Sequence, residues 1–134
     1  MNGYGRLLQK CGDYYIGNWE DDQISGYGEY YHHLGPWYKG EWKNEKQHGF
    51  GVEKWQDGSY YEGYYLNGAK HGKGKFIWGE SSKYTGDFYK NAMHGHGVYE
   101  YADGRKYEGS WNFNSMNGHG EFSWPDGKKY IGNV

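Results

Sequence analysis

Residues 61–74 read YEGYYLNGAKHGKG, and residues 107–120 repeat the same pattern as YEGSWNFNSMNGHG. In each stretch a tyrosine is followed two residues later by a glycine and four residues later by an aromatic residue. A Gly-x-Gly pair begins nine residues after that first glycine. Two copies of such a specific arrangement indicate an internal repeat.

The whole chain follows this repeat, with a period of 23 residues. Of the 25 glycines, 23 fall on four rows of the 23-residue grid, and only Gly68 and Gly79 do not. A fixed period of this length is typical of an array built from one supersecondary unit. The anchoring tyrosines are Tyr15, Tyr38, Tyr61, Tyr84, Tyr107 and Tyr130.

The composition is that of a folded array and not of a disordered chain. Aromatic residues make up 22% of the 134 residues, with 17 Tyr and 7 Trp, so burial must come largely from rings. The mean hydropathy of -1.21 is low, but disordered segments are poor in aromatic residues. The net charge of -2 favours neither nucleic acid nor an anionic membrane as a partner. The single cysteine excludes an internal disulfide and fits a reducing compartment.

Three Asp-Gly pairs, which begin at Asp57, Asp103 and Asp126, lie between segments of alternating pattern. Asp-Gly in this setting predicts a two-residue hairpin turn in which both positions have positive φ. Helix is disfavoured because glycine recurs every few residues. The sequence therefore predicts an all-β fold, an elongated and open-ended single antiparallel sheet of about six stacked β-hairpins in one array over residues 1–134. The hairpins are expected at approximately residues 3–23, 26–46, 49–69, 72–92, 95–115 and 118–134.

A two-residue turn at Asp-Gly also predicts the register of each hairpin. In the third hairpin it places Val52 opposite Gly63 and Phe50 opposite Tyr65, so that these four residues share one face. Trp55 then points to the other face, with Trp78, Tyr101 and Trp124 in the same column. The fourth hairpin lacks the Asp-Gly pair, which predicts a longer or differently shaped turn with Gly79 in the positive-φ position.

The glycines have a predicted physical role in this sheet. The glycine between the tyrosine and the aromatic residue lets neighbouring rings lie over the strand, because it has no side chain. The Gly-x-Gly pair permits a bend where the chain passes from one hairpin to the next.

The segments quoted above closely resemble the MORN repeat (membrane occupation and recognition nexus), whose period is also 23 residues. The resemblance covers essentially the whole chain. MORN repeats occur in junctional membrane proteins, phosphatidylinositol phosphate kinases, a lysine methyltransferase, and cytoskeletal and ciliary scaffolds. The resemblance implies a non-catalytic module without a cofactor that docks partners, often in a groove along the sheet. Choline-binding repeats are also short and aromatic, but their spacing and the Gly-x-Gly pair here fit poorly.

The resemblance also implies an intracellular location, whether cytoplasmic, cytoskeletal, ciliary or peripheral to a membrane. The expected partner is a peptide or helix of another protein, lying along the aromatic face of the sheet. Constant rings would form its floor, and a row that changes between repeats, such as Val52, Lys75 and Val98, would provide specificity. The candidate groove residues are Trp19, Tyr38, Trp42, Tyr61, Tyr65, Tyr84, Phe88, Tyr107 and Trp111.

Two other functions stay open. The densest basic patch consists of Lys70, Lys73 and Lys75, with Lys83 and Lys90 on nearby grid segments, and its first three lysines predict a contact with anionic phospholipid such as a phosphoinositide headgroup. The array could also be an accessory targeting module of a larger enzyme. Single-stranded nucleic acid is not expected, because the chain is acidic overall.

No residue pattern indicates catalysis or a metal site. His94 and His96 could face the same way, but no third ligand is evident beside them. Cys11 has no evident base nearby and is interpreted as a turn residue.

The strands at Gly3 and Val134 have no evident protection, which predicts either a longer chain or edge pairing with a second copy or another subunit.

Overall fold

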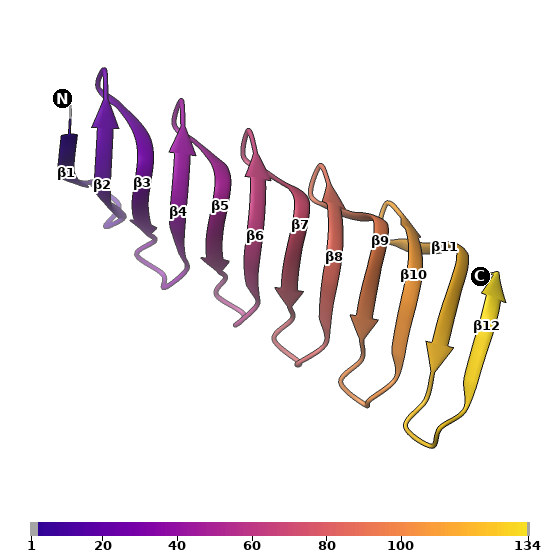
Figure 1. The fold of residues 1–134 in the computed structure, drawn as a ribbon. Coiled ribbons are helices and arrows are strands. Elements are labelled where there is room, and N and C mark those ends of the chain that lie inside the picture. The colour runs from indigo at the N-terminus through magenta and orange to yellow at the C-terminus, as the bar shows by residue number, and fades with distance from the viewer. Residues whose placement is uncertain (1–2, 134) are drawn as a thin grey trace.

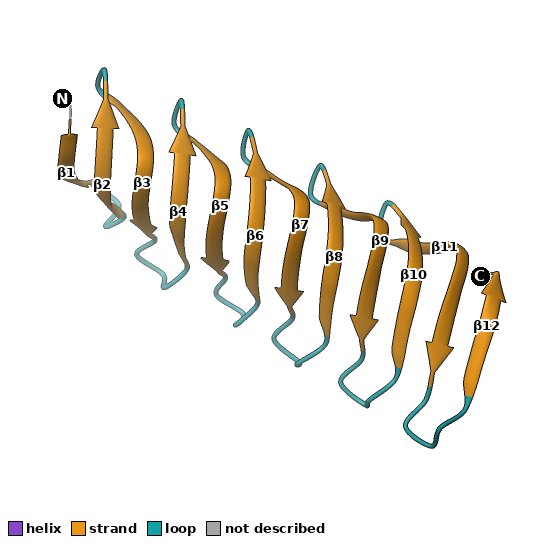
Figure 2. Ribbon diagram, in the orientation of Figure 1, coloured by secondary structure: helices purple, strands orange, loops and turns teal. Residues whose placement is uncertain are grey.

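The computed structural model describes residues 3–133, and these form one antiparallel sheet of 12 strands in chain order (Figure 1). This confirms the predicted all-β fold. Within the described residues there is no helix, and so none that could span a membrane (Figure 2). Val134, at which the last hairpin was expected to end, lies outside the described residues. The strands are β1 (Gly3–Leu8), β2 (Tyr14–Glu20), β3 (Gln23–Tyr31), β4 (Trp37–Lys43), β5 (Lys46–Lys54), β6 (Tyr60–Leu66), β7 (Ala69–Ile77), β8 (Lys83–Tyr89), β9 (Ala92–Glu100), β10 (Lys106–Asn112), β11 (Ser115–Ser123) and β12 (Lys129–Asn133).

Two kinds of connection alternate along the sheet, and each kind occupies one end of the strands (Figure 2). Five-residue loops join β1 to β2, β3 to β4 and so on. Two-residue turns join β2 to β3, β4 to β5 and so on. Both residues of each two-residue turn have positive φ, as at Asn67 (49°) and Gly68 (88°). Gly68, one of the two glycines off the grid, thus completes the Asn-Gly pair that this turn type prefers.

The prediction of a two-residue turn at Asp57-Gly58 is wrong. The pair lies inside the five-residue loop 55–59, where the Trp55 amide donates to the Ser59 carbonyl (2.9 Å). Of the pair, only Gly58 has positive φ (89°).

The longer loop shifts the pairing of β5 with β6 by one residue from the predicted register. Gly51 lies opposite Gly63, and Phe50 lies opposite Tyr64. Because side chains alternate along a strand, this shift moves Phe50 and Val52 to the face away from Tyr61.

The prediction for the fourth hairpin is also wrong. Its loop, residues 78–82, has the same length as the others and the same closing bond, from the Trp78 amide to the Ser82 carbonyl (2.8 Å). Ser81 adopts the positive φ (84°) that Gly58 adopts one repeat earlier, and Gly79 does not. A serine in this conformation keeps the loop geometry although the glycine is missing.

The predicted role of the glycines is confirmed at the Gly63–Gly74 pair, which lies under the Tyr61 ring. A Cβ at Gly63 would lie 2.6 Å from the Tyr61 hydroxyl, and a Cβ at Gly74 would lie 2.7 Å from two carbons of that ring. Neither position has room for a side chain.

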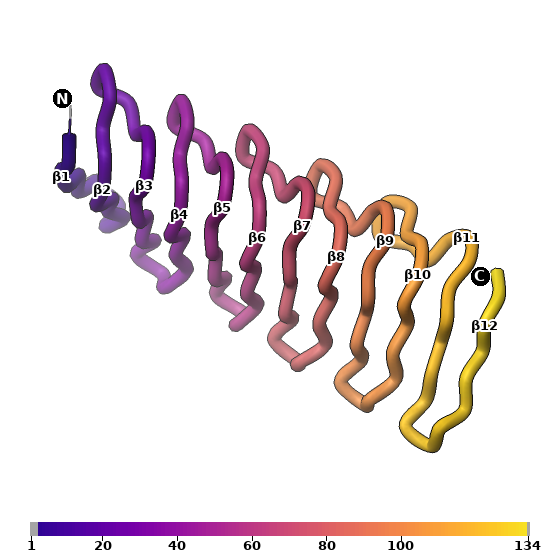
Figure 3. The backbone as a smooth tube through the Cα atoms, viewed as in Figure 1, coloured from indigo at the N-terminus to yellow at the C-terminus, as the bar shows by residue number. Residues whose placement is uncertain are grey.

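The Gly-x-Gly pair does bend the chain, but the bend lies inside β7 and not at the passage from one hairpin to the next. Gly72 has positive φ (83°), and the pairing of β6 with β7 shifts between Gly63 and Tyr65. Figure 3 shows the resulting kink of the odd-numbered strands near the two-residue turns. The sheet is thus not flat: its strands bend near the end that carries the two-residue turns.

The core of this single-layer sheet consists of rings on one face. Tyr61, Tyr84 and Tyr107 have no exposed surface. In an open sheet this burial is possible because the neighbouring aromatic rings cover each tyrosine, as Tyr65 covers Tyr61 and Trp111 covers Tyr107. The rings from Tyr15 to Tyr84 also meet the aromatic residue of the following repeat edge to face, as Tyr61 meets Phe88 at 5.2 Å and Tyr84 meets Trp111 at 5.3 Å.

Candidate functional site

The nine predicted groove residues lie together on one face of the sheet, but most of them are buried. Together with Tyr15 they form a row that we call the ring floor; it consists of the anchoring tyrosines from Tyr15 to Tyr107 and of Trp19, Trp42, Tyr65, Phe88 and Trp111. Seven of the nine form one buried cluster, against which Trp42 packs. The Trp19 ring contacts the Tyr15 ring at 5.5 Å. The ring floor is therefore a rigid base, and an incoming partner would touch little of it.

Most polar atoms of the ring floor are bonded within the sheet, but the buried Trp19 Nε1 has no hydrogen-bond partner among the described residues. The Tyr61 hydroxyl donates to the Tyr64 carbonyl (2.9 Å), and the other anchoring tyrosines repeat this bond three residues along their own strands. Trp111 Nε1 donates to the Gly97 carbonyl (3.1 Å). Desolvation raises the pKa of the Tyr15 phenol to about 12 and shifts that of Tyr61 upward as well. These hydroxyls are thus held neutral and are not candidates for acid–base chemistry at neutral pH.

A second row of rings, beside the ring floor, is accessible from outside. We call it the aromatic rail. Its ring centroids follow one another at 4.6–5.8 Å, as between Phe76 and Trp78 (4.6 Å) and between Trp78 and Tyr99 (5.3 Å). Most of its members are partly buried against the core, and Trp124 is 40% exposed. The aromatic rail consists of Trp55, Phe76, Trp78, Tyr99, Tyr101, Phe122 and Trp124.

The position of the aromatic rail shows that a second expectation from the predicted register is wrong. Trp55, Trp78, Tyr101 and Trp124 were expected on the face opposite the anchoring tyrosines, but they pack on the same face. Each is the first residue of a five-residue loop, so its direction follows from the loop and not from a two-residue turn. The row of large rings at this fixed grid position was visible in the sequence; its face was not.

Lys70 lies over the aromatic rail. Its Nζ is 5.0 Å from the Trp55 ring centroid and 5.6 Å from that of Phe76, within the range of a cation–π contact. Desolvation lowers the pKa of Lys70, and Glu53 partly offsets that shift. A surface hollow of about 540 Å³ opens here between Trp55, Lys70, Phe76, Trp78 and the 55–59 loop.

The structure does not bring the three predicted lipid-binding lysines together. Lys73 and Lys75 alternate with Gly74, whose Cα faces the Tyr61 ring, so both lie on the face opposite Lys70. Lys73 Nζ forms an ion pair with Asp87 (2.5 Å).

The row expected to provide specificity also lies on the face opposite the rings. Val52 pairs with Glu62 on this face and lines a hollow of about 510 Å³ with Trp37, Lys39 and Phe50. The predicted combination of constant rings and a changing row on one surface therefore does not occur.

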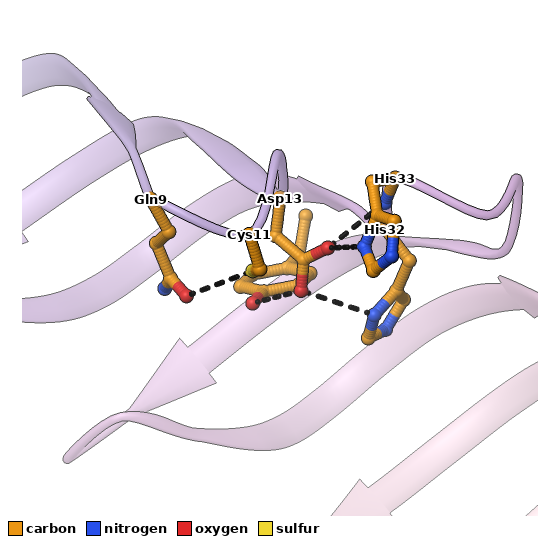
Figure 4. Close-up of polar contacts among 6 residues, drawn as sticks. Gln9, Cys11, Asp13, His32 and His33 are labelled. Carbon is orange, nitrogen blue, oxygen red and sulfur yellow. Dashed lines mark hydrogen bonds and ion pairs between the residues drawn. The ribbon is translucent and has the colours of Figure 1, made fainter.

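One group of potential metal ligands escaped the sequence pattern. Cys11, Asp13 and His33 come from two different loops, and the structure brings them together beside Tyr30 and His32 (Figure 4). The signal in the sequence was that neither loop has the Asp-Gly pair that begins at Asp57, Asp103 and Asp126 in other repeats. By contrast, His94 Nδ1 accepts a hydrogen bond from the Phe113 amide (3.3 Å), so this nitrogen has a structural partner in the sheet.

Comparison with known proteins agrees with this architecture. The family model described as MORN repeat matches residues 15–32, 38–60, 61–83, 84–104 and 107–129. No curated protein sequence matches. Among solved structures, the chain is similar to the SAS-4 (dCPAP) TCP domain in complex with a proline-rich motif of Ana2 (dSTIL) of Drosophila melanogaster. The TM-score is 0.59 at 18% sequence identity, over 98% of this chain and 72% of the other. At that identity the likeness shows the fold alone.

The matched repeats cover most of the chain, and their period is the period of the ring floor. This chain belongs to the MORN repeat family and is a repeat scaffold.

Proposed function

We propose that this protein is a non-catalytic intracellular scaffold that binds an extended segment of a partner protein along the aromatic rail. In this proposal it recruits that partner to a cytoskeletal, ciliary or membrane-apposed assembly. The observation that carries the proposal is the unbroken row of partly exposed rings from Trp55 to Trp124 above a rigid floor. The ring floor itself supports the rail and is not the contact surface.

Aromatic rings suit this role for physical reasons. They offer a large contact area at a low cost in side-chain entropy, and here the ring floor already restricts their motion. Indole N–H and phenol O–H groups on the rail can donate to the carbonyls of an extended chain. The rail follows the long axis of the sheet, so a linear segment could contact several repeats at once.

A proline-rich segment is the partner class that fits best. Such segments adopt a polyproline II helix before binding, and they dock on surfaces lined with aromatic rings. The complex of the similar Drosophila domain with a proline-rich motif supports this choice. Lys70 and Arg105, which lie against rail rings, would favour a carboxylate or carbonyl beside the prolines.

The test is selection of binders from a displayed library of proline-rich segments, followed by measurement of Kd for the best binder. Trp78→Ala should weaken binding about thirtyfold or more, because truncating a central aromatic anchor costs about 2 kcal/mol or more. Tyr64→Ala is the matched control, since Tyr64 is 51% exposed on the opposite face. Thermal melting of each variant checks that the array still folds.

Three results would contradict the proposal. The first is equal loss of binding in Tyr64→Ala, which would place the contact on the other face. The second is unchanged binding in Trp78→Ala. The third is a selection that yields no proline-containing segment above background.

The anionic-lipid alternative stays a prediction, and the separation of Lys70 from Lys73 and Lys75 does not favour it. Flotation with vesicles containing a phosphoinositide, using a variant with all three lysines changed to Glu, tests it. Pairing of the edge strands with a second copy or another subunit, and a role as a module of a larger enzyme, also stay predictions.

A further inference from the structure

The loops 9–13 and 32–36 lie side by side at the N-terminal end of the array; the first leads into β2 and the second follows β3, the strand paired with β2. From them come Cys11, Asp13 and His33, which we call the loop cluster. Each offers a ligand atom of a kind that binds transition metals, and these atoms all lie within 4.8 Å of one another. Over residues 3–133 this is the one such group of three (Figure 4).

The later repeats serve as an internal comparison. At the equivalent positions of the next loop the grid holds Gln56, Asp57 and Ser59. There the Asp57 carboxylate accepts the Ser59 amide (2.8 Å), which is an ordinary turn bond. At these positions the first loop holds Cys11 and Asp13, and the second loop holds His33. The three side chains lie close together in the structure. Turn geometry alone does not require a thiol, a carboxylate and an imidazole there.

Asp13 is the fixed centre of the loop cluster. It is buried, and its Oδ1 accepts both the His33 amide and His33 Nδ1 (2.8 Å each). Its Oδ2 accepts the Tyr30 hydroxyl (2.9 Å), and His32 Nδ1 lies 3.4 Å from the same oxygen. These contacts fix the Asp13 carboxylate between the two loops.

We propose that Cys11, Asp13 and His33 bind one divalent transition metal ion of the Zn²⁺ class. A thiolate, an imidazole and a carboxylate together are a ligand set that suits zinc and excludes calcium and magnesium. Ligand atoms held about 2.0–2.3 Å from a tetrahedral zinc ion lie about 3.3–3.8 Å from each other. The loop cluster is therefore close to that spacing, and rotation of the exposed Cys11 and His33 side chains can close the remainder.

Binding would release the Cys11 thiol proton to solvent, and the proton on the metal-binding nitrogen of His33 as well where that nitrogen carries one. The fourth position would hold water or the neighbouring His32.

Such a site would act as a clip at one end of the sheet. β1 is an edge strand, and most of its residues are exposed. The ion would tie the β1–β2 loop to the β3–β4 loop at the end of the β2–β3 pair. It would thereby secure the first hairpin, which has a neighbouring hairpin on one side only in the described sheet.

The test is titration of the full chain with Zn²⁺ and Co²⁺, with a phosphine reductant keeping Cys11 a thiol. We expect one ion per chain, a thiolate-to-cobalt charge-transfer absorption, and a rise in Tm with zinc. Cys11→Ser should abolish the charge-transfer absorption. Cys11→Ser and His33→Gln should each weaken zinc binding at least about tenfold. His119→Ala, at an exposed histidine of β11, is the control and should match the unchanged protein.

Circular dichroism without metal checks that each variant folds. Because Cys11→Ser and His33→Gln change different ligands, the test can still be read if one of the two variants does not fold. The proposal is overturned if no stoichiometric ion with a charge-transfer absorption is found. It is also overturned if Cys11→Ser and His33→Gln bind zinc as tightly as the unchanged protein. Binding that is lost in a His94→Ala, His96→Ala variant and kept in both loop variants would overturn it as well.

Discussion

At the scale of single residues, this fold depends on a match between one ring and two missing side chains. The Tyr61 ring lies over Gly63 of its own strand and Gly74 of the next, and its hydroxyl bonds to the Tyr64 carbonyl. The same arrangement recurs at each anchoring tyrosine from Tyr15 to Tyr107. Because the sheet has one layer, this contact takes the place of a conventional core.

Gly74→Ala should therefore destabilise the array by about 1–3 kcal/mol, since the new methyl group meets the Tyr61 ring. Urea unfolding followed by tryptophan fluorescence measures the change. The cost should shrink in a Tyr61→Ala background, where the ring is absent, and this double-mutant cycle is the control. An equal cost in both backgrounds would show that the ring is not the obstacle.

At the scale of elements, the two kinds of connection make different demands on the backbone. Two-residue turns need positive φ at both positions, and several are occupied by residues with a Cβ, such as Glu45 (63°) and Lys90 (48°). Five-residue loops need one positive φ, at their fourth residue, which is usually glycine. Since both kinds hold the strands antiparallel, an Asp-Gly pair in the sequence does not by itself reveal which kind is present.

Glu45→Gly should stabilise the protein by about 0.5–1 kcal/mol, because Asn-Gly is the preferred pair for this turn and glycine adopts positive φ without strain. Gln56→Gly is the matched control: Gln56 is exposed and its φ is not positive, so glycine there should destabilise by a similar amount. Thermal unfolding of both variants makes the comparison. A loss of stability in Glu45→Gly would contradict this account of the turn.

At the scale of the whole molecule, the sheet is a one-dimensional stack. Within the described residues each strand pairs with its neighbours in the chain, and the anchoring tyrosines from Tyr15 to Tyr84 pack on the aromatic residue one repeat later. Stability should therefore be roughly a sum of repeats and of the interfaces between them. The aromatic rail and the ring floor both exist only as products of this stacking.

Deletion of residues 63–85 removes one full period and joins Glu62 directly to Gly86, which restores the Tyr-x-Gly-x-aromatic pattern. The shortened chain should fold, and its urea m-value should fall by about one sixth, because one repeat in six is lost. Deletion of residues 63–84, one residue fewer, is the control. It turns Gly86 and Phe88 to the wrong face and should abolish cooperative unfolding. Similar unfolding of the two deletions would contradict a register set by the 23-residue period.

Much of this protein follows from its sequence alone. The 23-residue period and the spacing of Tyr61, Gly63 and Tyr65 determined an all-β array in which rings cover glycines. These features are local: a ring and a glycine two residues apart lie on the same face of any strand, whatever the rest of the chain does.

Only the tertiary structure decided which strand partners share that face. The five-residue loop, closed by the bond from the Trp55 amide to the Ser59 carbonyl, shifts the pairing of β5 with β6 by one residue from the predicted register. Because side chains alternate between the two faces of a strand, the shift moves every β5 side chain to the face opposite the predicted one. The same step brings Trp55 and Trp78 onto the aromatic rail and places Val52 on the other side. The meeting of Cys11 with His33 was likewise decided in space, because adjacency of two loops depends on how the hairpins stack and not on any spacing within one repeat.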